Sequence, residues 1–410
     1  MYNPLRSSRV LQRALSSTVA STVQARSLAT VAPNVPLQPT AKAHRVVVIG
    51  GGAAGLSVSH MLLRSGKFAA AEIAIVDPAG YHHYQPGWTL VGGGLKTKEQ
   101  LQRPLESLVD PNLRLYQEAV AGLQPEQNTI TLSNGDALSY DHLVIAPGVK
   151  IDLNSIDGLQ DALMDPTSLV CSIYTYETCD KVFRSIQKLK KGKAIFTQPA
   201  GLIKCAGAPQ KIMWLALDHW EKQSIYQSSQ TAHSPVKISF ATGLPVMFGV
   251  PKYSRALNKL REQRGVEAMF EHDLVSIKGN LASFKSPHSK ELVERPFDFL
   301  HVAPKMGPHK FVSDSVLSNE SGYVNINTET LNHKDYKNVW GIGDAAALPT
   351  SKTAAAITAQ APVLVSNLLQ AIGGFELSNK YDGYTSCPLT TGNGKVMLAE
   401  FKYGPEPYFT

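Results

Sequence analysis

Short apolar runs and helical repeats alternate along the chain from residue 45 onwards. Residues 45–49 (RVVVI) form an apolar run typical of a buried parallel strand, and residues 56–63 follow with a helical spacing of apolar positions. A second strand is predicted at residues 72–77 (EIAIVD). A strand, a helix and a second strand in this order predict a Rossmann-like unit of the α/β class.

The same pattern recurs further along the chain. Residues 193–197 and 236–242 are predicted as buried strands, and residues 209–221 between them as a helix. We therefore predict an α/β fold with two Rossmann-like dinucleotide-binding domains, the second inserted into the first. The predicted boundaries are 44–160 and 310–378 for the two parts of the first domain, 161–309 for the inserted domain and 379–410 for a short C-terminal segment.

A glycine-rich loop with GxGxxG spacing joins the first predicted strand to its helix. Gly50 allows a tight turn, Gly52 lets backbone N–H groups approach a pyrophosphate, and Gly55 lets helix and strand pack closely. Asp77 ends the second strand, where a carboxylate binds ribose hydroxyls. A loop that serves packing alone is the alternative, but the surrounding strands and helix favour a dinucleotide. The residues predicted to bind it here are Gly50, Gly52, Ala53, Ala54, Gly55 and Asp77.

Two later segments favour FAD over NAD as this dinucleotide. Residues 140–148 form a predicted strand and turn that resemble the segment where flavoprotein chains leave the FAD domain, with Pro147 where threonine is usual. Residues 338–344 end in Gly343 and Asp344 and resemble the second FAD fingerprint. We expect Asp344 to hydrogen-bond the ribityl chain, and Pro147, Gly148 and Gly343 to line the cofactor.

A helix is predicted to start within residues 349–360, with serine and threonine at capping positions. If its N-terminus points at the pyrimidine edge of the flavin, it stabilises the reduced, anionic flavin. Lys352 either adds a full positive charge there or is a solvated lysine of the first helical turn. The sequence leaves both interpretations open.

The inserted domain lacks the glycine loop of the first domain. After its first strand the chain runs through residues 199–205 (PAGLIKC) without GxGxxG, and the strand at 236–242 ends with no acid or arginine for an NAD(P) ribose. Both losses argue against NAD(P)H as the electron donor. Cys205 in this loop predicts that electrons enter through a thiol.

Cys205 directly precedes a predicted helix N-terminus, with Lys204 and Lys211 nearby in sequence. Both features lower a thiol pKa and favour the reactive thiolate. An isolated cysteine is more often a small core residue, but this position favours reactivity. The best partner is Cys387, predicted on a turn before a proline, where its thiol can face a pocket.

The other two cysteines, Cys171 and Cys179, precede a predicted helix and are interpreted as structural. The four cysteines show no paired spacing typical of zinc ligands, and we predict no metal site.

Five motifs in order resemble mitochondrial-type sulfide:quinone oxidoreductases, which belong to the two-dinucleotide-binding-domain flavoproteins. The similarity runs from about residue 45 to residue 407. It implies that FAD is the cofactor and that Cys205 and Cys387 are the two redox cysteines. The motifs are residues 84–92 (YQPGWTLVG), 204–211 (KCAGAPQK), 341–344 (GIGD), 349–356 (PTSKTAAA) and 381–388 (YDGYTSCP).

The resemblance also implies a reaction. Hydrosulfide opens a Cys205–Cys387 disulfide, leaving a persulfide on one cysteine and a thiolate on the other. We assign the flavin-facing thiolate to Cys205, because of its helix terminus, and the persulfide to Cys387. Two electrons then pass through FAD to ubiquinone, and a small acceptor such as glutathione, sulfite or another thiol removes the outer sulfur.

No apolar run reaches the about 20 residues that a spanning helix needs, so we expect any contact with the inner membrane to be peripheral. The family continues past this point with amphipathic helices that dip into the membrane and help to form the quinone site, whereas this sequence stops at residue 410. Either that tail is dispensable or the chain is truncated.

Residues 1–43 carry five basic residues and no acidic one, and the first acid of the chain is Glu72. A basic segment rich in serine and threonine is typical of a mitochondrial presequence, and a disordered basic tail is the alternative. Because the net charge of +7 is concentrated there, nucleic-acid binding loses its main support. We predict a mitochondrial protein on the matrix side.

Three other functions compete with this one. A type II NADH:quinone oxidoreductase shares the fold but should carry the missing second GxGxxG. A flavocytochrome-type sulfide dehydrogenase uses two cysteines but delivers electrons to a haem partner outside the cytoplasm, which the leader opposes. A truncated, non-catalytic flavoprotein is the third. His82, His83 and His301 are candidates to contact substrate or protons, although histidines of this kind are more often satisfied in a core or at a surface.

Overall fold

A computed structural model describes residues 42–408 of the chain. The predicted leader and linker, residues 1–43, therefore lie almost entirely outside the described residues. The described residues all belong to one compact unit. The domain boundaries at residues 160, 309 and 378 stay a prediction.

The first sheet forms around the strand that precedes the glycine loop. Strand β1 (Lys42–Ile49) lies between β2 (Ile73–Val76) and β8 (Ala137–Ile145), parallel to both. Because both faces of a parallel sheet are covered, the last four residues of β1 (VVVI) form a continuous apolar run, and all four are buried. The sheet is completed by β5 (Arg114–Tyr116), β6 (Val120–Gln124), β7 (Thr129–Leu132) and β19 (Val339–Gly341).

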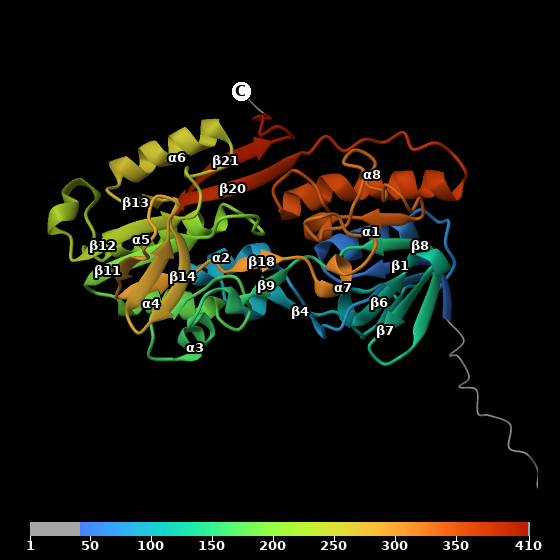
Figure 1. The fold of residues 1–410 in the computed structure, drawn as a ribbon, viewed down its shortest axis with the longest axis horizontal. Helices are drawn as coiled ribbons and strands as arrows, with labels where there is room; N and C mark the ends of the chain where they lie inside the picture. The colour runs from blue at the N-terminus through green and yellow to red at the C-terminus, as the bar shows by residue number, and fades with distance from the viewer. Residues whose placement is uncertain (1–41, 409–410) are drawn as a thin grey trace, which may run out of the picture. The chain divides into compact units, whose positions relative to one another are not determined.

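Two helices pack against each other beside this sheet (Figure 1). Helix α1 (Ala53–Arg64) follows the glycine loop directly, and α8 (Ala354–Ile372) comes from about 300 residues further along the chain. Residues from both helices and the sheet share one hydrophobic core, which includes Val48, Val58 and Leu364. The first dinucleotide-binding unit is therefore assembled from both ends of the described chain.

The second sheet is wholly parallel, whereas β6 and β7 make the first sheet mixed. Its order is β10 (Val170–Cys171), β17 (Phe299–His301), β11 (Gly192–Gln198), β12 (Val236–Thr242) and β13 (Glu267–Phe270). Helices α4 (Cys179–Lys188), α5 (Ala208–Lys222) and α6 (Pro251–Gln263) accompany it. The predicted strand at 236–242 and the predicted helix at 209–221 are confirmed, and the two-domain α/β fold class with them.

An antiparallel hairpin of β20 (Thr385–Gly392) and β21 (Lys395–Phe401) lies against α5 (Figure 1). Cys387 lies inside β20, so its predicted position on a turn is wrong. The turn prediction rested on the following proline, but β20 pairs on one side only with β21 in its own sheet, and such an edge strand tolerates proline.

The remaining described elements are short: β3 (Tyr81–His83), α2 (Trp88–Gly92), β4 (Gln102–Pro104), β9 (Lys150–Asp152), α3 (Leu159–Met164), β14 (Asp273–Lys278), β15 (Leu281–Lys285), β16 (Val293–Pro296), β18 (Lys305–Gly307) and α7 (Lys310–Ser313).

Helix α8 confirms the helix start predicted within residues 349–360. It begins at Ala354, because the Thr353 side chain accepts a hydrogen bond from the Ala356 N–H and caps it there. By length and composition alone, α8 is also apolar enough to cross a membrane. Its buried polar residues Gln360 and Asn367 hydrogen-bond within the fold, as in a core helix.

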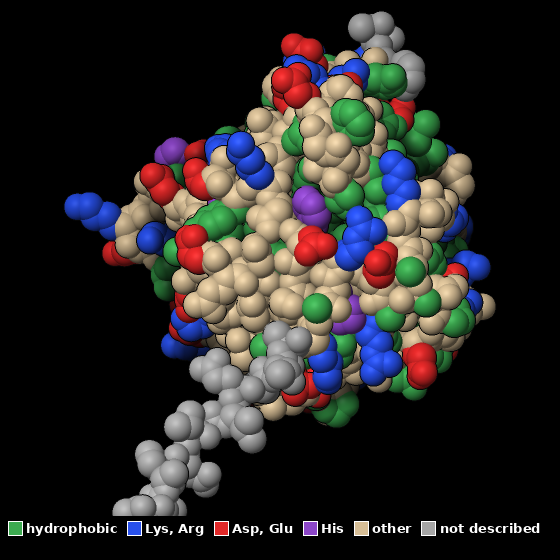
Figure 2. Space-filling view, turned by 90° about the vertical axis from the view of Figure 1, so that its right-hand side faces the viewer, with side chains coloured by type: hydrophobic (Ala, Val, Ile, Leu, Met, Phe, Trp, Pro, Cys, Tyr) green, Lys and Arg blue, Asp and Glu red, His purple; other side chains and the backbone are tan. Residues whose placement is uncertain are grey.

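Figure 2 shows basic and acidic side chains interspersed over one face of the molecule.

Candidate functional site

The three glycines of the first loop have three different surroundings. Gly50 has a φ of +104°, and an added Cβ would lie 2.3 Å from the Ala146 carbonyl oxygen. An added Cβ at Gly55 would lie 1.8 Å from the Gly50 carbonyl oxygen, so α1 can approach the loop this closely only with glycine there. Gly52 has an ordinary φ of −77° and no atom within 4 Å of an added Cβ. The open space beside Gly52 fits a pyrophosphate at the N-terminus of α1.

The structure brings the second predicted fingerprint to this loop. Ala53 and Ala54 begin α1. Gly343 has a φ of +69°, and an added Cβ there would lie 3.3 Å from the Cβ of Ala54. The two segments are therefore neighbours although about 290 residues separate them.

Asp77 also lies at the loop. Its Oδ2 accepts a hydrogen bond from the Gly51 N–H at 2.6 Å, and its Oδ1 accepts one from the Ala79 N–H at 2.8 Å. Gly148, one residue after Pro147, has a φ of +75° and open space where a Cβ would be. The predicted turn after β8 is thus formed beside the loop, since the Ala146 N–H donates to the Ile49 carbonyl.

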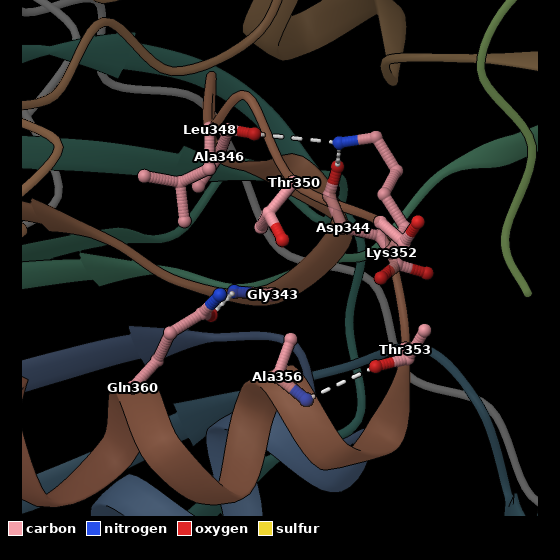
Figure 3. Close-up of a pocket in the computed structure, with 10 residues that line it drawn as sticks. Gly343, Asp344, Ala346, Leu348, Thr350, Lys352, Thr353, Ala356 and Gln360 are labelled. Carbon is pink, nitrogen blue, oxygen red and sulfur yellow. Dashed lines mark hydrogen bonds between the residues drawn. The ribbon is translucent and has the colours of Figure 1, made fainter. Parts of the chain in front are cut away.

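A small cavity lies where β19 leads into α8 (Figure 3). The Gln360 side chain accepts a hydrogen bond from the Gly343 N–H at 2.9 Å. Lys352 reaches the carbonyl oxygens of Asp344 and Ala346 with its ammonium, at 2.5 and 3.3 Å.

Lys352 is only 6% exposed, so its interpretation as a solvated first-turn lysine is wrong. Burial lowers the pKa of Lys352 to about 8, against the opposing charge of Asp344. Burial also raises the pKa of Asp344, opposed by Lys352 and Lys204. A cationic group and a carboxyl group are therefore held together in a poorly solvated pocket.

These residues fit FAD. The open approach at Gly52 accommodates phosphate, Asp77 lies at the end of β2 where a ribose is bound, and Asp344 and Lys352 supply polar groups beside the N-terminus of α8.

Cys205 lies next to this cavity. Its backbone N–H donates to the Lys352 carbonyl at 2.8 Å, and Lys204 and Lys352 form an isolated parallel bridge. Cys205 has a φ of +52°, a left-handed conformation that is uncommon outside glycine. The predicted place before a helix N-terminus is confirmed, since α5 begins at Ala208.

The two candidate redox cysteines lie together with one lysine. Lys211 Nζ donates to the Cys205 Sγ at 3.2 Å. A hydrogen bond from the Cys387 thiol, together with the Lys211 charge, holds the pKa of Cys205 well below its ordinary value, against the effect of burial. The same pairing with Cys205 raises the pKa of Cys387, which is 2% exposed. The site therefore favours one thiolate, on Cys205.

A glycine makes the approach of Cys387 possible. An added Cβ at Gly207 would lie 2.7 Å from the Cys387 Sγ, closer than such atoms can come. The glycine between Cys205 and α5 thus leaves room for the second sulfur.

The other predicted neighbours lie elsewhere. Lys204 donates to the Gln85 side chain at 2.6 Å and lies over the Trp88 ring. Burial raises the pKa of both Cys171 and Cys179, the latter to about 12, which agrees with their structural interpretation. His301 is fully buried and stacks on Phe196.

Two residues at the site were not found from the sequence. Gln360 could have been noticed as a polar residue on the apolar face of a helix. Tyr174, which is 3% exposed and interacts with the charges of both Cys205 and Cys387, carries no such signal. His82 contacts the loop through the Gly51 carbonyl at 3.2 Å, and His83 stacks on Tyr176.

The chain is similar to several known proteins. Residues 44–195 match the family model of the pyridine nucleotide-disulphide oxidoreductases. The mitochondrial sulfide:quinone oxidoreductase of Schizosaccharomyces pombe is 46% identical over 89% of this chain and 82% of its own length. The protein of the same name from Dictyostelium discoideum is 42% identical over 88% of this chain and 78% of its own length.

A solved structure shows the same fold. The sulfide:quinone oxidoreductase from Aquifex aeolicus superposes with a TM-score of 0.73 at 20% sequence identity, covering 88% of each chain.

Proposed function

The chain belongs to the family of mitochondrial sulfide:quinone oxidoreductases, and we propose from this premise that it oxidises sulfide and delivers the electrons to quinone. The observation that supports the chemistry is the pair of Cys205 and Cys387 beside Lys211, joined through the backbone to the cavity at Lys352. The enzyme is an FAD-dependent oxidoreductase of the mitochondrion.

Bound FAD supplies a two-electron acceptor next to the thiols and a donor for quinone. The residues that would hold it are the loop at Gly50, Gly52, Ala53, Ala54 and Gly55, together with Asp77, Pro147, Gly148, Gly343, Asp344 and Lys352. The N-terminus of α8 and the buried ammonium of Lys352 favour negative charge in their neighbourhood, as a reduced flavin carries it.

The cysteines carry the sulfur chemistry. Starting from a Cys205–Cys387 disulfide, hydrosulfide forms a bond to the Cys387 sulfur while the disulfide bond breaks, and the electron pair stays on Cys205 as a thiolate. Lys211 stabilises this leaving thiolate, which is why we assign the persulfide to Cys387. The left-handed backbone at Cys205 is the kind of local strain that clusters at reactive sites.

A sulfur acceptor completes the turnover. A small acceptor, such as glutathione, sulfite or another thiol, takes the outer sulfur from Cys387 and leaves a thiolate there. Rejoining of the two thiolates as a disulfide releases two electrons, for which bound FAD would be the acceptor. We propose ubiquinone as the final acceptor, with the protein on the matrix side in peripheral contact with the inner membrane.

The competing NADH:quinone function has less support. The segment after β11 carries Cys205 and no glycine loop, and the relatives that are 38–46% identical are named sulfide:quinone oxidoreductases.

The proposal can be tested by mixing the FAD-loaded protein anaerobically with sulfide or with NADH. The visible absorbance of the flavin reports its reduction. We expect bleaching by sulfide and not by NADH, because a second hydrosulfide can take the outer sulfur from Cys387 when no other acceptor is present. A soluble quinone should reverse the bleaching. Bleaching by NADH and not by sulfide would return the chain to the NADH-dependent branch.

A further inference from the structure

Lys211 is a buried cation with an unusual partner. It lies in the first turn of α5 and is 8% exposed. Its Nζ donates to the Cys205 sulfur, and among residues 42–408 no carboxylate forms an ion pair with it. Burial alone would lower the pKa of Lys211, but Cys205 and Cys387 raise it above its ordinary value. A buried ammonium of this kind requires an anion beside it.

The Cys205 thiolate is that anion only while the two cysteines are reduced. When Cys205 and Cys387 form a disulfide, both sulfurs are neutral. The ammonium of Lys211 then has no negative partner, although it remains buried. The oxidised site is therefore electrostatically prepared for a small anion from outside.

A second buried donor, the Tyr174 hydroxyl, lies close enough to both cysteines for their charges to act on it. The Tyr174 hydroxyl is buried and has no hydrogen-bond partner, and its ring belongs to the same hydrophobic core as Cys387. The turn that carries it is fixed, because the Tyr174 N–H donates to Ser172 and the Thr178 hydroxyl donates to the Ser172 carbonyl. Burial raises the pKa of Tyr174, and the charges of both cysteines add to this, so the phenol stays protonated and can donate.

We propose that Lys211 and Tyr174 form the binding site for hydrosulfide when Cys205 and Cys387 are joined. The inference rests on the proposed function. Hydrosulfide binds as an anion beside the ammonium and accepts a hydrogen bond from the phenol. Its sulfur then bonds to Cys387, the disulfide breaks, and the charge moves to Cys205. The site holds one negative charge before and after the step, and the number of electrons is unchanged.

The test is rapid mixing of the oxidised, FAD-loaded protein with increasing sulfide. Lys211→Met removes a buried charge at nearly constant volume, and Tyr174→Phe removes an unpaired hydroxyl, so both variants should fold. We expect the half-saturating sulfide concentration to rise at least about tenfold in Lys211→Met and severalfold in Tyr174→Phe, as for hydrogen bonds to a charged group.

Matched controls exist for both variants. Tyr140→Phe removes another buried hydroxyl without a partner, in β8. Lys181→Met removes a lysine that donates to the carbonyls of Ala162, Leu163 and Asp165. Both controls should keep the wild-type half-saturating concentration.

The pH dependence separates binding from leaving-group stabilisation. In the wild type, the half-saturating concentration of total sulfide should fall as pH rises through the ionisation of hydrogen sulfide, because the anion is the bound form. In Lys211→Met this dependence should disappear. If both variants lower only the limiting rate and leave half-saturation and its pH profile unchanged, the binding site is refuted. If sulfide fails to reduce the wild type and Tyr140→Phe, the proposed function itself is wrong.

Discussion

Two loops occupy corresponding places in the two Rossmann-like units and do different chemistry. The loop after β1 contains three glycines and leads into α1, whereas the loop after β11 contains Cys205 and leads into α5. In the first, open space beside Gly52 fits a phosphate; in the second, Lys211 holds a sulfur 3.2 Å away. In both places, the N-terminus of a helix is available to bind an anion. This position of the fold therefore favours negative charge, and the side chains of each loop decide which anion is held there.

The largest effect should come from removing either sulfur of the pair formed by Cys205 and Cys387. Cys205→Ser or Cys387→Ser should slow reduction of the flavin by sulfide by at least about a thousandfold, because residues that act as one unit fail together. FAD content should stay at the wild-type value, since neither thiol belongs to the first loop. Stopped-flow absorbance measures the rate, and Cys179→Ala is the control. If sulfide still reduced the flavin at the wild-type rate in either serine variant, that cysteine would not take part in the reaction.

A second experiment fills the open space beside Gly52, in the loop after β1, with a side chain. Gly52→Val should lower FAD affinity at least about a hundredfold, or about 2.7 kcal/mol, because its side chain would fill the space assigned to phosphate. Its φ is ordinary and no atom lies within 4 Å of an added Cβ, so the free energy of unfolding of the apoprotein should fall only by the loss of a favourable N-cap residue, about 1 kcal/mol or less. Gly249→Val, also unobstructed, should bind FAD normally. Wild-type FAD affinity in Gly52→Val would remove this loop from the cofactor site.

A smaller effect is expected on the pKa of Cys205, the thiol in the loop after β11. Cys387→Ala removes the hydrogen bond that most lowers the pKa of Cys205, so this pKa should rise. In the reduced protein, alkylation by iodoacetamide should then require a higher pH. Because the folded pKa lies below the ordinary value of 9, the unfolded chain binds more protons between the two values. The free energy of unfolding should therefore rise with pH across that window, and the rise should begin at higher pH in Cys387→Ala. An unchanged alkylation profile would contradict the pairing.

The smallest effect concerns the free energy of unfolding and the residue that caps the start of α8. Helix α8 is capped by Thr353, whereas α5 begins after Gly207 with no side-chain cap. Thr353→Ala should lower the free energy of unfolding by about 1 kcal/mol, seen as a lower Tm. Thr358→Ala, inside the same helix and exposed, should have little effect. Equal Tm changes in the two variants would show that the cap is not the cause.

Patterns local to one segment were predicted well. The strand at 236–242 and the helix at 209–221 follow from continuous apolar runs and helical spacing, which depend little on distant residues. The glycine loop was predicted because each glycine has a specific backbone task.

Several features that depend on distant partners were not predicted. Cys387 lies in a strand because residues 395–401 pair with it, and the local proline suggested a turn instead. The sequence placed both Lys204 and Lys211 near Cys205. Only Lys211, in the first turn of α5, reaches the sulfur, whereas Lys204 reaches Gln85. Tyr174 follows β10 of the second sheet, and only the folding of the chain brings it near Cys205 and Cys387.

The hydrogen bond from the Cys205 N–H to the Lys352 carbonyl joins the two halves of the site through the main chain. Side-chain replacement leaves such a bond in place, so alanine scanning would pass over the contact that sets the separation of thiol and cofactor pocket. An amide-to-ester replacement at residue 205, which deletes only the N–H, would loosen that spacing while every side chain stays as it is.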